Sequence, residues 1–406
     1  MQKLRDGLHR IGGSKRIVHI VIAAVVLLAT FNAGILVGNG SIQVGKMASQ
    51  NGKLPGALDY ASVNEVYQAL KTNYDGKLTQ QQLLDGLKVG LAEATDDPYT
   101  QYFNTSEAKK FNEQLTGSFS GIGAQLGQND DKALVVVAPI SGSPAEKAGL
   151  KAGDIITGIN GKTTTGMSID EAVSRIRGTK GTDVTLAIVR DSSDMKLTIT
   201  RDEITVPSVE YKILDDNIGY IQISQFSDDT IRLASDAAQK FKDADVDGII
   251  VDLRDDPGGL LDAAVGVANL WLPKGQTILQ EKRGGQVIQT YASETTNPPL
   301  KGIPTVALIN NGSASAAEIL AGALRDNNTA TLMGEKSYGK GSVQQIQPFK
   351  DGSQLKVTIA RWYRPNGQNI DKKGINPDKT VTLSEEQAKA GTDTQKDAAL
   401  EFLKQQ

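Results

Sequence analysis

The sequence predicts an α/β protein of several domains, attached to a membrane by one N-terminal helix. The chain has 406 residues, whereas a single hydrophobic core usually stops growing near about 250 residues. Short apolar strands alternate with helical segments over residues 206–382, which is the pattern of a layered α/β domain. Residues 17–38 are almost continuously apolar and long enough to cross a bilayer as a helix.

The composition is that of an ordinary globular protein. Hydrophobic residues make up 39% of the chain and charged residues 22%, and 42 glycines indicate many tight turns. The formal net charge is -3, and no dense run of lysine and arginine follows residue 20. We therefore expect no nucleic-acid partner.

Basic residues set the direction of the apolar segment in the membrane. Five of them precede it: Lys3, Arg5, Arg10, Lys15 and Arg16. The positive-inside rule then predicts a cytoplasmic tail at residues 1–16, a transmembrane anchor at 17–38 and an extracytoplasmic remainder on a bacterial cell membrane. The alternative is a cleaved signal peptide, although the apolar run is long for one and no clear A-x-A site follows it. The absence of cysteine fits an exported protein without disulfides.

Histidine is missing from the expected extracytoplasmic part. The two histidines of the chain are His9 and His19. A Ser-His-Asp triad, a Cys-His dyad and a histidine zinc site are therefore excluded beyond the membrane. Catalysis there would use serine, lysine, carboxylate or tyrosine side chains.

Three further segments flank the expected globular domains. Residues 39–56 are polar and glycine-rich, which is typical of a flexible linker. Residues 57–110 carry apolar residues near helical spacing and predict a helical cap or an oligomerisation element, so a homodimer is a further expectation. Residues 383–406 predict a C-terminal helix.

Residues 111–205 predict a small β-rich domain. A buried strand over 133–140 is followed by a short helix over 143–150 and by a hairpin with Asn160-Gly161 at its turn. This order resembles a PDZ domain, and the resemblance puts Gly121, Ile122 and Gly123 in the loop that binds a peptide carboxylate. Successive N–H groups in such a loop form an anion nest, and the peptide adds to the sheet edge as a strand. The alternative is that these glycines only shape a turn.

Two serines stand where an expected strand leads into an expected helix. Ser313 and Ser315 follow the strand over 305–309, and apolar residues recur at helical spacing directly after Ser315. The free N–H groups at the start of a helix stabilise negative charge, so the N–H of Ala316 is a candidate donor to an oxyanion. The alternative is an ordinary N-cap serine.

The segment DLRDDPGG at residues 252–259 is a candidate for the second oxyanion donor because its two glycines expose N–H groups. Its acids, Asp252, Asp255 and Asp256, lie too close together in one turn to predict a metal site. We expect the side chains of Asp255 and Asp256 to point away from the oxyanion. No metal and no other cofactor is expected.

A candidate base lies in the segment GEKSYGKGSVQ at residues 334–344, which holds Lys336 and Lys340. A lysine with its ordinary pKa of about 10.4 is protonated and accepts a proton only where burial favours the neutral amine. Glycines on both sides of Lys340 allow such close packing. The alternative is a solvated loop lysine.

Together these segments resemble the carboxyl-terminal processing peptidases, serine proteases with a crotonase-like core. The resemblance rests on NNGSASAAEI, GEKSYGKGSVQ, DLRDDPGG and the preceding PDZ-like domain, and it covers about residues 60–380. It implies Ser315 as nucleophile, Lys340 as general base and Gln344 as its orienting residue. It also implies an oxyanion hole formed by Gly259 and Ala316. Where the family often has asparagines in its glycine-rich segment, this chain has Asp255 and Asp256.

The resemblance implies an endopeptidase that binds the free C-terminus of a protein in its PDZ domain and cleaves the chain upstream. It makes Arg177 a candidate sensor of bound substrate, and Trp362 or Tyr363 candidates for an apolar surface around the lysine. The rival hypotheses are a catalytically silent PDZ scaffold and a crotonase-like enzyme acting on acyl thioesters.

Overall fold

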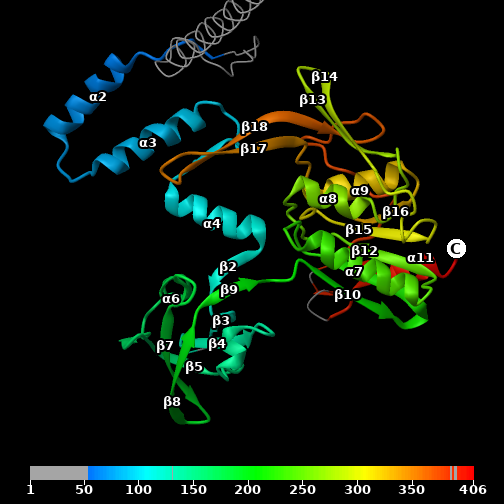
Figure 1. Ribbon diagram of the computed structural model, residues 1–406, viewed down its shortest axis with the longest axis horizontal. Helices are drawn as coiled ribbons and strands as arrows, with labels where there is room; N and C mark the ends of the chain where they lie inside the picture. Colours follow the sequence, from blue (N-terminus) through cyan, green and yellow to red (C-terminus); the bar gives the residue numbers. More distant parts are fainter. Residues whose placement is uncertain (1–53, 130, 385, 388–390) are drawn as a thin grey trace, which may run out of the picture. The chain divides into compact units, whose positions relative to one another are not determined.

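The computed structural model describes residues 54–129, 131–384, 386–387 and 391–406 (Figure 1). The expected cytoplasmic tail, the transmembrane anchor and most of the linker lie outside the described residues. No helix in the described part of the chain is long and apolar enough to span a membrane. The chain divides into two units, Met1–Leu78 and Thr79–Gln406. In the described part of the first unit, helix α2 (Tyr60–Asn73) has no buried residue.

A six-stranded sheet forms the centre of the second unit. Its order is β10-β11-β12-β15-β16-β19, with β10 antiparallel to β11 and all other neighbours parallel. Its strands are β10 (Val209–Leu214), β11 (Ile218–Ile223), β12 (Gly248–Asp252), β15 (Thr305–Ile309), β16 (Ala330–Gly334) and β19 (Lys379–Thr380). Because β12 and β15 are parallel neighbours, the loops that follow them leave the same edge of the sheet side by side.

Helices cover both faces of this sheet (Figure 1). Ile249 and Val251 of β12 face the larger core, where α7 (Thr230–Asp243), α8 (Leu261–Ala268) and α9 (Ala316–Asp326) pack. Ile250 between them faces a smaller core under α11 (Thr394–Leu403), the terminal helix. Both faces are buried, which explains why the central strands read as continuous apolar runs.

A second, antiparallel sheet adjoins the first. Strand β18 lies between β1 and β13, β14 pairs with β13, and β17 also pairs with β18. The strands are β1 (Gln101–Phe103), β13 (Thr277–Arg283), β14 (Gln286–Ala292), β17 (Ser342–Pro348) and β18 (Gln354–Tyr363). Helix α3 (Gln80–Glu93) precedes β1 and α4 (Thr105–Thr116) follows it. Strand β1 lies within residues 57–110, in the segment DDPYTQYF that was expected only as a break after the helices, and α4 crosses residue 110.

The small β-rich domain has a core of its own. Its sheet runs β3-β4-β5-β7-β8, with β6 paired to β5, and the ribbon of β2 and β9 connects it to the rest of the unit. Its elements are β2 (Ser118–Gly121), β3 (Ala124–Gln128), β4 (Leu134–Pro139), α5 (Pro144–Lys147), β5 (Ile155–Ile159), β6 (Lys162–Thr163), α6 (Ile169–Ile176), β7 (Asp183–Arg190), β8 (Ser193–Thr200) and β9 (Asp202–Thr205). The expected hairpin is confirmed, since Asn160 and Gly161 both have positive φ, 49° and 78°.

Candidate active site

Three loops meet beyond the carboxyl ends of β12 and β15, and main-chain hydrogen bonds join them. The Asp256 carbonyl accepts from the Ala314 N–H at 2.9 Å, which links residues 252–260 to residues 310–315. The Ser313 carbonyl accepts from the Tyr338 N–H at 3.0 Å, which links the second loop to residues 335–341. The candidate nucleophile, oxyanion donors and base are therefore held in one place by the backbone.

The two serines have different environments. Ser313 is fully buried, and its Oγ donates to the Leu253 carbonyl at 2.7 Å and accepts from the Asn310 N–H at 2.9 Å. Ser315 is partly exposed and precedes α9 with φ 52° and ψ -113°. An ordinary N-cap has an extended backbone, and a positive φ in a residue other than glycine costs about 1–3 kcal/mol. Ser313 is thus a structural residue, and the chain holds Ser315 in a strained conformation.

Gly258 and Gly259 pack closely against neighbouring backbone because they have no side chain. A Cβ on Gly258, whose φ is +95°, would lie 2.7 Å from Cβ of Ser315 and 2.9 Å from N of Ala316. Gly259 has φ +143°, and a Cβ there would lie 2.0 Å from the Phe226 carbonyl oxygen. In the described part of the chain, the N–H groups of Gly259 and Ala316 have no hydrogen-bond acceptor. Two free donors therefore flank the partly exposed serine.

Lys340 is half-buried in the loop before β17. Burial lowers the pKa of Lys340 from its ordinary value, and the nearby Glu318 carboxylate opposes this shift. The loop packs tightly, because a Cβ on Gly339 would lie 2.7 Å from N of Gly374 and a Cβ on Gly341 would lie 2.6 Å from N of Asp371. The expected close packing around Lys340 is confirmed, whereas Lys336 in the same loop is exposed.

Glu318 connects the nucleophile loop, residues 310–315, to the base loop, residues 335–341. Sequence reasoning gave Glu318 no role. Its fully buried carboxylate accepts from the N–H groups of Ser315, Gly339 and Lys340 at 2.9, 2.8 and 2.9 Å, and from the Ser337 hydroxyl. Burial raises the pKa of Glu318, while these four donors oppose the rise. The S-x-x-E spacing of Ser315 and Glu318, typical of a capping box, was the available sequence signal.

An aromatic residue far away in the sequence lies beside the base. The Lys340 Nζ lies 5.2 Å from the centre of the Tyr99 ring. Trp362, one of the two expected aromatic neighbours, is buried and donates from Nε1 to the Lys340 carbonyl at 2.9 Å. The ring of Tyr363 instead lies 4.3 Å from Lys282 Nζ. Sequence reasoning missed Tyr99, which precedes β1 in the DDPYT segment.

Gln344 lies on β17 directly after a β-bulge. Its Nε2 donates to Ser342 Oγ at 2.8 Å and to Thr358 Oγ1 at 3.4 Å. Within the described residues its amide makes no hydrogen bond to Lys340, and none joins Lys340 Nζ to Ser315 Oγ.

One cavity of about 550 Å³ brings the candidate residues together. Ser315, Ala316, Lys340, Gln344 and Gly259 all line it. The remaining lining residues include apolar side chains and three residues of α4: Leu260, Leu261, Ile319, Val343, Ile346, Trp362, Phe111, Gln114 and Leu115. The candidate residues therefore share one cavity with many apolar side chains.

The acids near the oxyanion donors differ from one another. Asp252 forms a salt bridge with Arg254 and accepts from the Tyr220 hydroxyl at 2.7 Å. Asp255 is exposed and accepts from Asn310 Nδ2 at 2.9 Å. Asp256, which was also expected to point away from the oxyanion, is fully buried, and its Oδ1 accepts from the Gly258 N–H at 2.7 Å. Burial raises the pKa of Asp256 to about 8, which removes the charge conflict that had argued for an outward orientation.

The sequence matches two known protein families. Residues 217–381 match peptidase family S41, and residues 135–190 match the PDZ domain. The carboxy-terminal processing protease CtpA of Bacillus subtilis is 40% identical over 359 residues, which cover 88% of this chain and 75% of that protein. The chain belongs to peptidase family S41. It is a serine-type endopeptidase of the carboxyl-terminal processing class, as the sequence motifs implied.

Two further comparisons are consistent with this family. A probable CtpA-like serine protease of Staphylococcus aureus is 40% identical over 329 residues, or 80% of this chain and 65% of that protein. This chain thus covers just under two thirds of the staphylococcal relative. A putative S41 protease from Bacteroides fragilis has a similar fold, with a TM-score of 0.54 at 16% identity over 87% of this chain and 99% of that one.

The PDZ domain of this peptidase contains the expected loop between β2 and β3. Ile122 is buried, and its carbonyl accepts from the Ala145 N–H at 2.8 Å, while the Gly123 carbonyl accepts from the Ile140 N–H at 2.8 Å. Gly123 has φ +76°, and a Cβ there would lie 2.4 Å from Cβ of Ser143. The carbonyl groups of this loop therefore point into the domain.

Arg177, at the end of α6, lies next to this loop. A Cβ on Gly121 would lie 3.8 Å from Arg177 Cγ, and the guanidinium lies 4.3 Å from the centre of the Phe119 ring. The same guanidinium forms a salt bridge of 2.9 Å with Glu113 on α4. Arg177 is thus already paired with a residue of the helix that lines the catalytic cavity.

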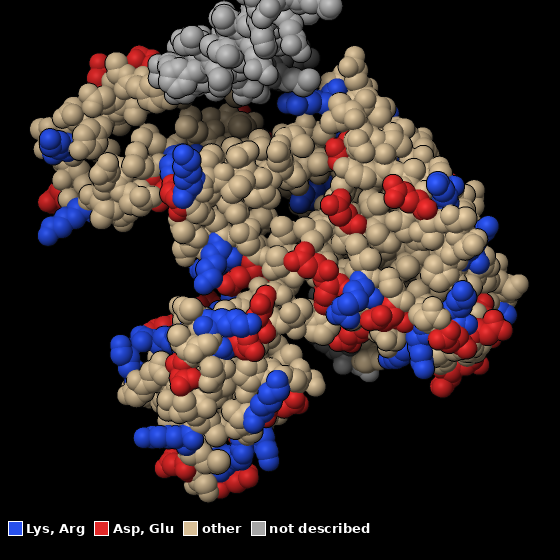
Figure 2. Space-filling view, in the orientation of Figure 1, with Lys and Arg blue, Asp and Glu red and all other residues tan. Residues whose placement is uncertain are grey.

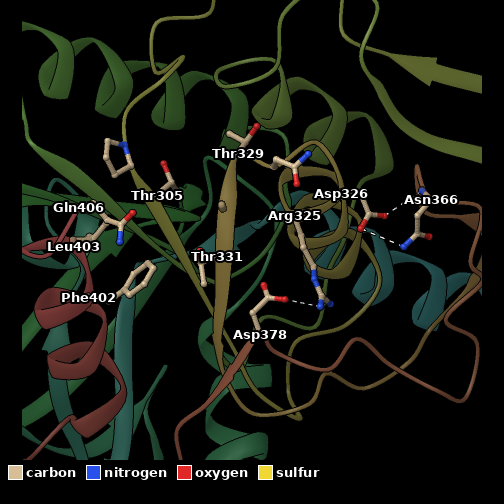
Figure 3. A pocket seen from close by; sticks show the side chains of 13 residues that line it. Thr305, Arg325, Asp326, Thr329, Thr331, Asn366, Asp378, Phe402, Leu403 and Gln406 are labelled. Atoms are coloured by element: carbon tan, nitrogen blue, oxygen red, sulfur yellow. Dashed lines mark hydrogen bonds and ion pairs between the residues drawn. The ribbon is translucent and has the colours of Figure 1, made fainter.

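Other surfaces of the peptidase are less suited to catalysis. A cavity of about 660 Å³ beside α11 contains Arg325, Asp326, Asn366 and Asp378, but Arg325 pairs with Asp378 and Asp326 with Asn366 (Figure 3). On the face drawn in Figure 2, positive and negative side chains are interspersed.

Proposed function

We propose that this peptidase works through a Ser-Lys dyad, with Ser315 as nucleophile, Lys340 as general base and Gln344 as its orienting residue. The observation that carries the proposal is the half-buried Lys340, which lines the same cavity as the strained Ser315. A general base must be a neutral amine. Because burial lowers the pKa of Lys340, a larger fraction of this lysine is neutral at a given pH than of a solvated lysine. The described part of the chain contains no histidine, because the two histidines of the sequence are His9 and His19.

In the proposed reaction the Ser315 Oγ attacks a peptide carbonyl and Lys340 Nζ takes the hydroxyl proton. The N–H groups of Gly259 and Ala316 donate to the tetrahedral oxyanion, each contact being worth about 2.7–4 kcal/mol in comparable sites. Collapse breaks the C–N bond, and the leaving amine takes the proton back from Lys340. Neutral Lys340 then takes a proton from a water molecule as its oxygen attacks the ester carbonyl. The C–O bond to Ser315 breaks, the acid product leaves, and Ser315 Oγ takes the proton back from Lys340.

The proposed substrate is an extracytoplasmic protein whose free C-terminus binds the PDZ domain. The loop at Gly121, Ile122 and Gly123 would receive the carboxylate, and Arg177 beside it would add a positive charge once it leaves Glu113. The peptide upstream of the C-terminus would reach the catalytic cavity and be cleaved there.

We further propose a single-pass anchor at residues 17–38, with the PDZ domain at 111–205 and the protease core at 206–382 outside the cytoplasm. The apolar length of the anchor and the basic residues before it support this orientation. Sizing the mature N-terminus tests it, because a chain that begins after roughly residue 34 would indicate a cleaved signal peptide. The exposed apolar side chains of α2, Val63, Val66 and Leu70, support a homodimer, which sedimentation of the detergent-solubilised chain tests.

The decisive experiment measures cleavage of an unstructured protein with an apolar C-terminus by the full chain in detergent. We expect Ser315→Ala and Lys340→Ala to lose at least a thousandfold in kcat, because each removes a reacting group. Lys336→Ala is the matched control, since this lysine is exposed in the same loop. Full activity in Ser315→Ala would disprove the dyad, and binding without cleavage by the wild type would favour a scaffold.

A further inference from the structure

The carboxyl group of Asp256 is buried with only half of its hydrogen-bonding capacity used. Its side chain is 0% exposed. Oδ1 accepts from the Gly258 N–H at 2.7 Å, whereas Oδ2 has no hydrogen-bond partner among the described residues. An ionised carboxylate with a single hydrogen bond is very unfavourable in such a place, so the group is held as the neutral acid.

This carboxyl group is connected to the oxyanion donors through one hydrogen bond. Gly258, which donates to it, packs against Cβ of Ser315 and N of Ala316, and Gly259 follows directly. The carbonyl of Asp256 itself accepts from the Ala314 N–H at 2.9 Å. The side chain of Asp256 therefore fixes the Pro257–Gly258 peptide, which directly precedes the peptide that carries the Gly259 N–H.

Charged groups near this loop are engaged elsewhere. Arg254 pairs with Asp252 and Asp393, and Asp255 is bonded to Asn310. Glu318 of α9 accepts from four donors, and the Nζ of Lys340 lies over the Tyr99 ring. Among the described residues, the Gly258 N–H is the one group that favours the ionised form of Asp256; burial opposes it and dominates, raising the pKa of Asp256 to about 8.

We propose that Asp256 is a positioning residue that acts as a neutral carboxylic acid, keeping Gly258 and Gly259 in the oxyanion-hole conformation, and that its ionisation disables the hole. The inference rests on the proposed oxyanion hole at Gly259 and Ala316. Two physical effects support it. A negative charge this close to the oxyanion opposes its formation at low dielectric. An ionised side chain that turned toward water would also leave the Gly258 N–H without its acceptor.

This proposal predicts that kcat has a descending limb at alkaline pH in addition to its ascending limb. Cleavage requires neutral Lys340, so kcat first rises with pH. It also requires protonated Asp256, so kcat falls again as this group ionises at alkaline pH. In the active form the side chain of Asp256 is a neutral carboxylic acid and that of Lys340 is a neutral amine.

The test compares kcat from pH 6 to pH 10 for the full chain and its Asp256→Asn variant. Asparagine can keep an oxygen acceptor for Gly258 but carries no charge at any pH, so we expect kcat to rise to a plateau and the alkaline fall to disappear. Asp255→Asn, which makes the same charge change on the exposed neighbour, should keep both limbs. An unchanged alkaline fall in Asp256→Asn would overturn the inference.

A second readout needs no activity. Folded Asp256 keeps its proton up to about pH 8, whereas in the unfolded chain it ionises near 3.8. Asp256 therefore makes an increasingly unfavourable contribution to the folding stability of the wild type between these two values, and Asp256→Asn lacks this contribution. We expect the Tm of the variant to gain on that of the wild type as pH rises through this window. A constant difference would mean that folded Asp256 is already ionised and would contradict the proposal.

The two proposals fail separately. A flat Tm difference or a retained alkaline limb would remove only the role of Asp256, provided that Ser315→Ala and Lys340→Ala stay inactive. Full activity in Ser315→Ala would remove the dyad, while the Tm comparison would still report whether Asp256 is neutral in the fold.

Discussion

The N–H groups of Ser315 and Lys340 donate to the same atom, Oε2 of Glu318, each at 2.9 Å. The two residues are 25 positions apart in the chain, and this shared acceptor fixes the distance between their backbones. The other oxygen of Glu318 accepts from the Gly339 N–H and the Ser337 hydroxyl. One buried carboxylate thus aligns the proposed nucleophile with the proposed base.

Replacing this carboxylate by an amide should damage the alignment. In Glu318→Gln the amide NH₂ faces N–H donors where an oxygen accepted before, so we expect a loss of about 2–4 kcal/mol in stability and at least a tenfold fall in kcat. The charge that raises the pKa of Lys340 also disappears, so the ascending limb of the kcat profile should move to lower pH. Chemical unfolding and pH-dependent kinetics measure both effects; a shift of this limb to higher pH would contradict the assignment.

Removing the buried base should stabilise the fold while it abolishes activity. The pKa of Lys340 is lower in the folded chain than its ordinary 10.5, so the unfolded chain binds the proton more strongly and stability rises with pH up to about that value. Methionine carries no charge, so Lys340→Met avoids the free-energy cost of burying or deprotonating the amine. We expect its Tm to exceed that of the wild type at pH 7 and to approach it near pH 10. Lys336→Met is the control for the loss of a lysine, and equal changes in the two variants would argue against burial as the cause.

Tyr99 should affect the base and not the nucleophile. Its ring covers Lys340 Nζ, so Tyr99→Leu exposes the amine to water and loses the aromatic face. We expect the ascending limb of kcat to change position in Tyr99→Leu and to stay nearly in place in Tyr99→Phe, which keeps the ring. If both variants keep the wild-type limb, the ring has no influence on Lys340.

Gly258 should not tolerate a methyl group. In Gly258→Ala the new Cβ would lie 2.7 Å from the Ala314 carbonyl oxygen and from Cβ of Ser315, at a φ of +95°. We expect at least a hundredfold loss in kcat, since the loop must move away from the nucleophile. Gly275→Ala is the matched control, because Gly275 has φ +91° but nothing within 4 Å of a Cβ. If both variants lost the same fraction of kcat, backbone strain alone would account for the effect.

The pair of Arg177 and Glu113 should influence substrate affinity. The two side chains are partly exposed, so the salt bridge is worth less than about 1 kcal/mol, and Glu113→Gln should barely change stability. If Arg177 receives the substrate carboxylate, Glu113→Gln lowers KM a few-fold and Arg177→Ala raises it for a free but not for an amidated C-terminus. Arg175→Ala, which removes an exposed pair with Glu171, is the control. The same KM for both kinds of C-terminus in the wild type would contradict this role.

Local patterns in the sequence predicted much of the fold. Strands β11, β12, β15 and β16 of the central sheet were expected, because burial of both faces leaves apolar runs, and β18 of the second sheet was expected as well. Strands β10, β13, β14 and β17 were missed. In β13, β14 and β17 polar and charged side chains interrupt the apolar pattern, and pairing with distant strands holds these segments in place. Strand β1 was missed for a similar reason, since three residues form a strand only beside β18.

By itself the sequence determined the order of the domains and the motifs that carry Ser315, Lys340 and Gly259, because these depend on short stretches of chain. Only the tertiary structure decided that Glu318 and Tyr99 lie beside the candidate residues and that the side chain of Asp256 is buried. Hydrogen bonding across the fold, stacking between residues 99 and 340, and burial all depend on which loops meet at the edge of the central sheet. A single stretch of sequence does not specify which distant loops come into contact in the folded chain.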